Sequence, residues 1–363
     1  MQLSVAGTCR RIARIALAGW LALAAVALPA ASTDAESTPG SLASNQQRQT
    51  RDAALEPERA ARIGRIIADP DQACLAAGAP PGTAAAQIAI DRAVGALEAS
   101  PLGAWLLRQA RARRVLICLD RTTGLAAYYR AEIRLIGLQT GLAAAAKAVF
   151  LAHELAHVLQ HPGYSNSRSF PVHDLILMHR MREATAEAIA TRVLWQMRAR
   201  GRSEPWEAKL RTGYRDIVRA FASAMVSAPA GGDAAAQELR ATRAAFERWF
   251  AWPERLQQYD DHMLEHLERI ARDRRGLRTP QRTLSDDFLR GITRYAGETF
   301  LDAGAEPPLS GPRYRSGLSA ENATRLARIK DASEETSAAA GLALPKAGPD
   351  SAEQALDPAF LPD

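Results

Sequence analysis

Three residues near the middle of the chain have the types and spacing of a metal site with a catalytic base. Residues 151–159 read Leu-Ala-His-Glu-Leu-Ala-His-Val-Leu and contain the pattern H-E-x-x-H. On an α-helix, residues four apart differ by about 40° around the axis, so His153 and His157 can direct both imidazoles at one ion. Glu154 lies about 100° further round, where its carboxylate can reach a metal-bound water without being a ligand. The pattern predicts a Zn²⁺ site with Glu154 as general base.

The alternative interpretation of this stretch is an ordinary core helix with two buried histidines. Two imidazoles and a carboxylate in so apolar a segment need polar partners, because burial without them costs several kcal/mol. A metal ion supplies such a partner, and this favours the metal site.

A catalytic zinc usually has three protein ligands and a water, so one further ligand is needed. The metzincin pattern H-E-x-x-H-x-x-G-x-x-H would place Gly at position 160 and His at position 163, where this chain has Gln160 and Gly163. In the other pattern a glutamate from a following helix completes the site. Residues 182–188, Arg-Glu-Ala-Thr-Ala-Glu-Ala, offer Glu183 and Glu187.

Together, H-E-x-x-H and the glutamate segment resemble the gluzincin branch of zinc metallopeptidases, including thermolysin-like enzymes and uncharacterised exported bacterial metallopeptidases. The similarity covers roughly residues 115–194. It implies a zinc ion held by His153, His157 and Glu183, with Glu154 as general base in the hydrolysis of a peptide or protein substrate. The aspartate that lies beside the metal ligands in this branch falls on Glu187, which is longer by one methylene.

Further polar residues are candidates for the same site. An oxyanion donor is expected in a hydrolase, and Tyr259 is the first candidate, with His262 and Tyr164 as others. His179 precedes Glu183 by one helical turn and shares its face, so this histidine could line the cleft. The residues 262–266, His-Met-Leu-Glu-His, spell the inverted motif H-x-x-E-H. A packing stripe with a solvated face is the better interpretation of that segment.

The fold class expected is α+β: a mainly helical, zincin-like domain with a small antiparallel sheet before the site helix and further helices toward the C-terminus. The strand at 132–138 is expected at the sheet edge, where an extended substrate could add as another strand. The predicted boundaries are a signal peptide at 1–31, a flexible linker at 32–55, a metallopeptidase domain at 56–302 and a disordered tail at 303–363. Within the domain, the sheet spans about 114–138, the site helices about 142–160 and 172–200, and a helical subdomain about 206–302; the last helix of that subdomain is expected from Asp286 to about Asp302.

The N-terminus has the pattern of a secretory signal. Arg10, Arg11 and Arg14 precede an apolar run from Ile15 to Leu28, and small residues follow. A membrane span needs about 20 residues, so the run is short for one. The alternative is an uncleaved anchor over 12–31. In both cases the protein is exported to the periplasm or secreted, and the membrane is contacted only through such an anchor.

Charge and cysteine content limit the remaining possibilities. The 363 residues carry a net charge of +6, half of it from the three arginines of the signal, and the other arginines are spread along the chain. Nucleic acid is therefore not expected as a partner. Cys74 and Cys118 are either one disulfide or two unrelated thiols. The alternative to an enzyme is a catalytically inactive zincin-fold binding or scaffold protein of the cell envelope.

Overall fold

The computed structural model describes much of the chain between residues 57 and 339, in two compact units. The described residues are 57, 60–66, 73–77, 84–121, 125–164, 170–227, 233–272, 284–301 and 306–339, without the side chains of 161–164 and 333–339. The predicted signal peptide and linker lie outside these ranges. One unit comprises 1–159 and 189–218, and the other 160–188 and 219–363. The fold is α+β as predicted, mostly helical with a small sheet.

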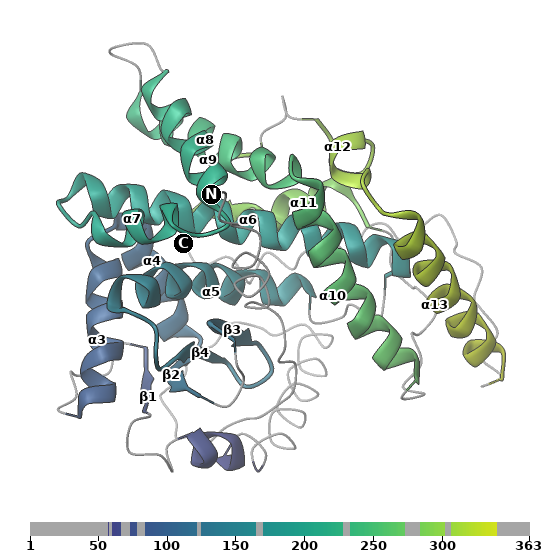
Figure 1. Ribbon diagram of the computed structural model, residues 1–363, viewed down its shortest axis with the longest axis horizontal. Coiled ribbons are helices and arrows are strands. Elements are labelled where there is room, and N and C mark those ends of the chain that lie inside the picture. The colour runs from purple at the N-terminus through teal and green to yellow at the C-terminus, as the bar shows by residue number, and fades with distance from the viewer. Residues whose placement is uncertain are drawn as a thin grey trace, which may run out of the picture. The chain divides into compact units, whose positions relative to one another are not determined.

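The first unit contains a four-stranded mixed sheet (Figure 1). Its strands are β1 (Cys74–Ala76), β2 (Leu116–Asp120), β3 (Ala127–Arg130) and β4 (Leu135–Gln139), in the order β1-β2-β4-β3. The β2–β4 pair is parallel, which corrects the prediction of a purely antiparallel sheet. Because β4 is paired on both sides, the prediction of a substrate-binding edge at 132–138 is wrong.

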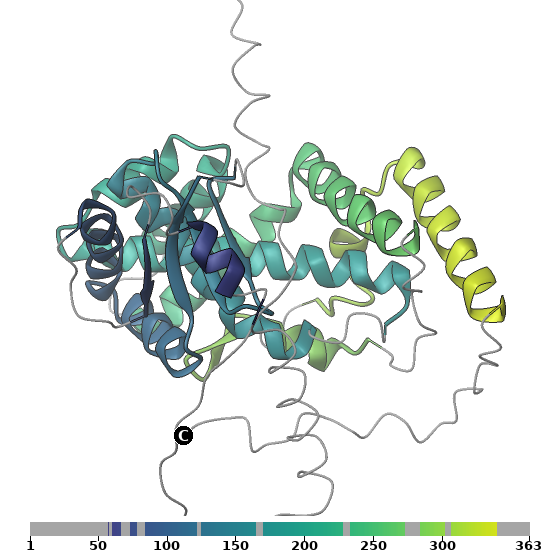
Figure 2. The same cartoon turned by 90° about the horizontal axis from the view of Figure 1, so that it is seen from below.

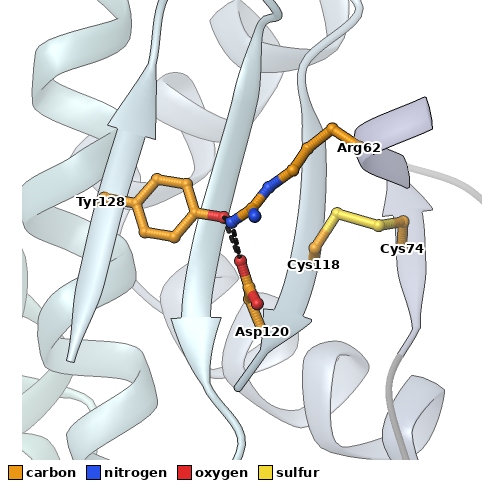
Figure 3. The surroundings of a disulfide bond; sticks show 5 residues. All are labelled: Arg62, Cys74, Cys118, Asp120 and Tyr128. Carbon is orange, nitrogen blue, oxygen red and sulfur yellow. Dashed lines mark hydrogen bonds and ion pairs between the residues drawn. A yellow bond between two sulfur atoms is a disulfide. The ribbon is translucent and has the colours of Figure 1, made fainter. Parts of the chain in front are cut away.

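A buried polar cluster crosses the sheet from β3 to β2. The Tyr128 ring lies over Gly137 of β4, where an added Cβ would meet ring atoms at 2.3 Å. Glycine at this position lets the Tyr128 hydroxyl reach across β4 and donate to the Asp120 carboxylate (Figure 3). Arg62, from the helical segment 60–66, pairs with the same carboxylate at 2.6 Å. The Arg62–Asp120–Tyr128 cluster thus holds the segment 60–66 against the sheet.

A disulfide bond joins Cys74 to Cys118, which is the paired interpretation of these two residues. The two cysteines are directly opposite in the antiparallel β1–β2 register. Ile63 and Ile66 of the helical segment pack beside Cys118 and Tyr128, over one face of the sheet (Figure 2). The three-residue strand β1 is therefore fixed covalently as well as by its ladder.

Helices α3 (Ala85–Glu98) and α4 (Pro101–Ala112) precede β2, and α3 contacts β1 and β2. Ser100 caps α4, since its Oγ accepts from the Gly103 N–H at 2.9 Å and donates to Gln196 Oε1 at 2.7 Å. Gln196 belongs to α6 (Val172–Ala199), and α7 (Glu204–Leu210) follows. These contacts anchor the C-terminal part of α6 on α4.

The second unit is built on the N-terminal part of α6 and on later helices. The helices are α8 (Arg215–Val226, of which residues from 219 belong here), α9 (Ala234–Phe250), α10 (Pro253–Arg272), α11 (Asp286–Ile292), α12 (Pro312–Arg315) and α13 (Ala320–Ala339). Arg180 of α6 forms a buried bidentate pair with Asp260 of α10. The Arg180 guanidinium also donates to the carbonyls of Tyr314 and Ser316, at 3.1 and 2.8 Å. One arginine therefore connects α6 to α10, to α12 and to the residue that follows α12.

Two expectations for the C-terminal region differ from the structure. The helix expected to run from Asp286 to Asp302 ends at Ile292, and the hairpin β5 (Arg294–Tyr295) and β6 (Glu298–Thr299) follows. Ala296 and Gly297 have φ of 53° and 80°, the left-handed pair that a two-residue hairpin turn requires. Part of the predicted tail is also ordered, because α13 packs on α10 through the Arg325–Glu268 ion pair.

Among the described residues, no helix is both long and apolar enough to cross a membrane.

Candidate metal centre

The helix that carries H-E-x-x-H is α5 (Ala144–Tyr164), and its interior position follows from its composition. Alanine and leucine are strong helix formers, and apolar residues surround the axis, so every side of the helix can be buried. Leu151, Ala152, Leu155 and Ala156 are fully buried. His153, Glu154 and His157 are therefore held in an apolar environment, as the sequence predicts. The helix continues past its predicted end at 160, through Tyr164.

The first turn of α5 is hydrogen-bonded to the loop that follows β4. The Lys147 ammonium donates to the Thr140 carbonyl at 2.8 Å and to the Leu142 carbonyl. Burial lowers the pKa of Lys147 below its ordinary value. This lysine donates to the carbonyls of the preceding loop and so sets where α5 begins, nine residues before the first histidine of the motif.

The two histidines converge as the four-residue spacing predicts. Their Nε2 atoms are 3.0 Å apart, and the rings are nearly perpendicular at 79°. Two zinc–nitrogen bonds at a tetrahedral angle place the nitrogens about 3.3 Å apart. The observed pair is close to that separation, so both nitrogens can reach a common ion with a small adjustment.

Glu183 of α6 supplies the third ligand atom of the group. One ligand atom from each of His153, His157 and Glu183 lies within 4.8 Å of the others, and all three residues are buried. Within the described part of the chain, this is the one group of at least three His, Cys, Asp or Glu residues with metal-binding geometry. Two imidazole nitrogens and a carboxylate oxygen are a donor set that catalytic zinc takes, whereas magnesium and calcium prefer oxygen ligands. The residues present therefore fit a zinc ion.

Three of the other candidates, Glu187 and His179 of α6 and Tyr259 of α10, are buried but are not members of this group. Glu187 follows Glu183 by one helical turn, and the structure leaves Glu187 out of the ligand set. His179 contacts Tyr259, with ring centroids 5.9 Å apart. Tyr259 also packs on Trp249, with a centroid distance of 5.1 Å. The side chain of Tyr164 lies outside the described residues.

The inverted motif at 262–266 lies on α10 and forms a packing stripe, as expected. Met263 and Leu264 are buried and Glu265 is exposed. Neither His262 nor His266 belongs to the metal-binding group found among the described residues. The two zinc motifs that the chain spells therefore have different surroundings.

One residue beside the site was considered only as a departure from the metzincin pattern. Gln160 is buried and its Nε2 donates to the Arg182 carbonyl at 3.1 Å, one residue before Glu183. The spacing of Gln160 in the sequence could have identified it as a neighbour of the site, because Gln160 follows His153 by seven residues and His157 by three. Residues at these spacings share one helix face.

Comparison with known proteins identifies a family that this chain matches. The family described as "Putative metallopeptidase family (DUF6782)" matches residues 59–300. No curated protein and no solved structure matches the chain. The matched region contains the sheet, α5, α6 and the helices through α11.

Proposed function

The chain belongs to this metallopeptidase family, whose sequence pattern matches two thirds of the length of the chain. On that premise we propose that the protein is a zinc-dependent peptidase. The observation that carries the proposal is the convergence of His153, His157 and Glu183, whose ligand atoms lie within 4.8 Å of one another in a buried setting. These three residues would hold the zinc ion.

Glu154 is the proposed general base. A bound zinc ion supplies a water of lowered pKa and polarises the scissile carbonyl. Glu154 neighbours the first histidine on the same buried helix, so its carboxylate can take the proton from that water. The oxygen of that water would then form a bond to the carbonyl carbon of the peptide, the carbon–nitrogen bond would break, and Glu154 would return the proton to the leaving amine. The buried surroundings exclude bulk water and strengthen these electrostatic interactions.

Two further residues have proposed supporting roles. Glu187 falls at the position where the gluzincin branch has an aspartate beside the metal ligands, and this resemblance supports a role close to the site. Tyr259 is the proposed donor to the developing oxyanion, and its packing against His179 and Trp249 supports a fixed ring orientation. The substrate is a peptide or protein, with no nucleic acid involved.

We also propose that the protein is exported to the periplasm or secreted. The arginines and apolar run of the first 28 residues support this proposal, as does the Cys74–Cys118 disulfide, because disulfides persist in oxidising compartments. The N-terminal mass of the mature protein distinguishes a cleaved signal from a retained membrane anchor.

The test of the function is the substitution Glu154→Gln, which keeps the size of the side chain and removes the base. We expect hydrolysis of fluorescein-labelled casein to fall by about 10²- to 10⁴-fold, the usual contribution of a general base. Zinc content, measured by atomic emission on purified protein, should remain at one ion per chain. Glu265→Gln is the matched control, because Glu265 is exposed on α10 and belongs to the inverted motif.

The outcomes separate the enzyme from a binding or scaffold protein. A Glu154→Gln variant as active as the parent would exclude Glu154 as the base. Purified parent protein without stoichiometric zinc would favour a metal-free binding protein. Loss of activity in Glu265→Gln would move the chemistry to the inverted motif.

A further inference from the structure

Gln160 lies on the same stripe of α5 as the two histidines. Successive residues turn by about 100° around a helix, so positions 153, 157 and 160 fall within about 60° of one another. The stripe therefore presents two imidazoles and then an amide, one turn further along the axis. Gln160 is buried like the histidines.

The Gln160 amide bonds to the backbone of α6 beside a metal ligand. Its Nε2 donates to the carbonyl oxygen of Arg182 at 3.1 Å. A carbonyl oxygen has two lone pairs, so this oxygen can accept from a side chain while it takes part in the helix. Residue 182 immediately precedes Glu183, and the bond therefore acts on the stretch of backbone from which that carboxylate projects.

A second partner holds the amide from another element. The Tyr295 hydroxyl, on β5, hydrogen-bonds with the Gln160 side chain. Burial raises the pKa of Tyr295 well above its ordinary value, so this hydroxyl stays protonated and neutral. An amide NH₂ has two hydrogens, which is enough to serve both partners. Gln160 is thus fixed at the carbonyl of 182 and at a buried tyrosine.

We propose that Gln160 is a positioning residue of the metal centre, which sets the location of Glu183 through the Arg182 carbonyl. The inference rests on the proposed zinc site and adds to it a residue that is not a ligand. Groups that orient metal ligands through a hydrogen bond typically contribute 10- to 100-fold to metal affinity. Tyr295 supports the Gln160 amide and should contribute less to metal affinity. Its hydroxyl can affect Glu183 only through two successive hydrogen bonds, the first to the Gln160 amide and the second from that amide to the carbonyl of residue 182.

The test is the substitution Gln160→Met, which keeps an unbranched side chain of similar length and removes the amide. We expect zinc affinity, measured by competition with a chromophoric chelator, to fall by about 10- to 100-fold. The absorption spectrum of the Co²⁺-substituted protein should also change in band position and intensity, because the carboxylate ligand has moved. Gln257→Met is the matched control, since Gln257 is exposed on α10.

A second variant, Tyr295→Phe, tests the same chain of bonds without altering α5. We expect a change of zinc affinity in the same direction as in Gln160→Met but smaller. Thermal unfolding in EDTA shows whether each variant folds, so a loss of structure is recognised separately from a loss of metal. If Gln160→Met does not fold, Tyr295→Phe decides.

Parent-like zinc affinity and a parent-like cobalt spectrum in folded Gln160→Met would overturn the inference and leave the zinc site standing. An equal loss of affinity in Gln257→Met would also overturn the inference. A parent protein that binds neither ion would overturn both the positioning role and the proposed function.

Discussion

Two buried polar clusters of this protein differ in the chemical nature of the atoms that face one another. In the Arg62–Asp120–Tyr128 cluster, a guanidinium and a hydroxyl both donate to one carboxylate, so positive and negative charge are balanced by the chain itself. In the group of His153, His157 and Glu183, three atoms that can bind a cation converge instead. The first arrangement stabilises a fold, and the second has the donor atoms that a metal ion requires. Burial alone does not distinguish the two, whereas the chemical identity of the facing atoms does.

The difference predicts that only the histidine group responds to zinc, and this is the largest expected effect. With free zinc buffered at about a thousand times Kd, the free energy of unfolding should rise by about 4 kcal/mol relative to EDTA, because only the native state presents the assembled ligands. His157→Ala should abolish this gain. Urea unfolding at both zinc levels measures it.

The matched control for that prediction is His173→Ala. His173 lies at the start of α6 with an exposed side chain, so this variant should keep the full zinc-dependent gain. A gain that survives in His157→Ala would contradict the assignment of this ligand.

The second prediction concerns the charge-balanced cluster. Arg62→Met should lower the free energy of unfolding by about 3 kcal/mol, because Asp120 is fully buried and would lose its cationic partner. The loss should be the same in EDTA and in zinc. Urea unfolding again measures the change, with Arg65→Met as control, because Arg65 lies on the same helical segment with an exposed side chain. A loss that appeared only with zinc present would show that the two clusters are coupled.

The convergence of His153 and His157 could be predicted from the sequence, whereas the strand order of the sheet could not, and the reason is the range of the interactions. His153 and His157 are related by the geometry of a single helix, which local spacing determines. The order β1-β2-β4-β3 depends on pairings between distant segments, and nothing in residues 74–76 alone marks a strand. The starts of α9 at residue 234 and of α10 at residue 253 are likewise determined locally, because Asp233 is an N-cap and Pro253 occupies the first turn of its helix.

Other features escaped prediction because tertiary contacts determine them. Ala296 adopts a left-handed conformation that its residue type does not favour, and the hairpin it forms was read as a continued helix. The predicted tail has a composition typical of disorder, yet Tyr314 is fully buried and its carbonyl accepts a hydrogen bond from the Arg180 guanidinium. The partner that orders this segment is distant in the sequence. Gln160 was missed for the same reason, since its acceptor lies 22 residues away.

The smallest predicted effect uses pH to separate the two clusters. Burial raises the pKa of the Tyr128 hydroxyl well above the ordinary value of 10.0, and the hydrogen bond to Asp120 raises it further. Above about pH 10 the unfolded chain releases this proton while the native protein retains it, so stability must fall as pH rises, by about 1.4 kcal/mol per pH unit. Tyr128→Phe keeps the ring over Gly137 and lacks the proton. Urea unfolding in EDTA, with no metal to contribute, should therefore show the parent losing about 1.4 kcal/mol more than this variant by about pH 11. Parallel stability curves for the two proteins would mean that Tyr128 ionises equally well in the native state, and the cluster would then not be closed to solvent.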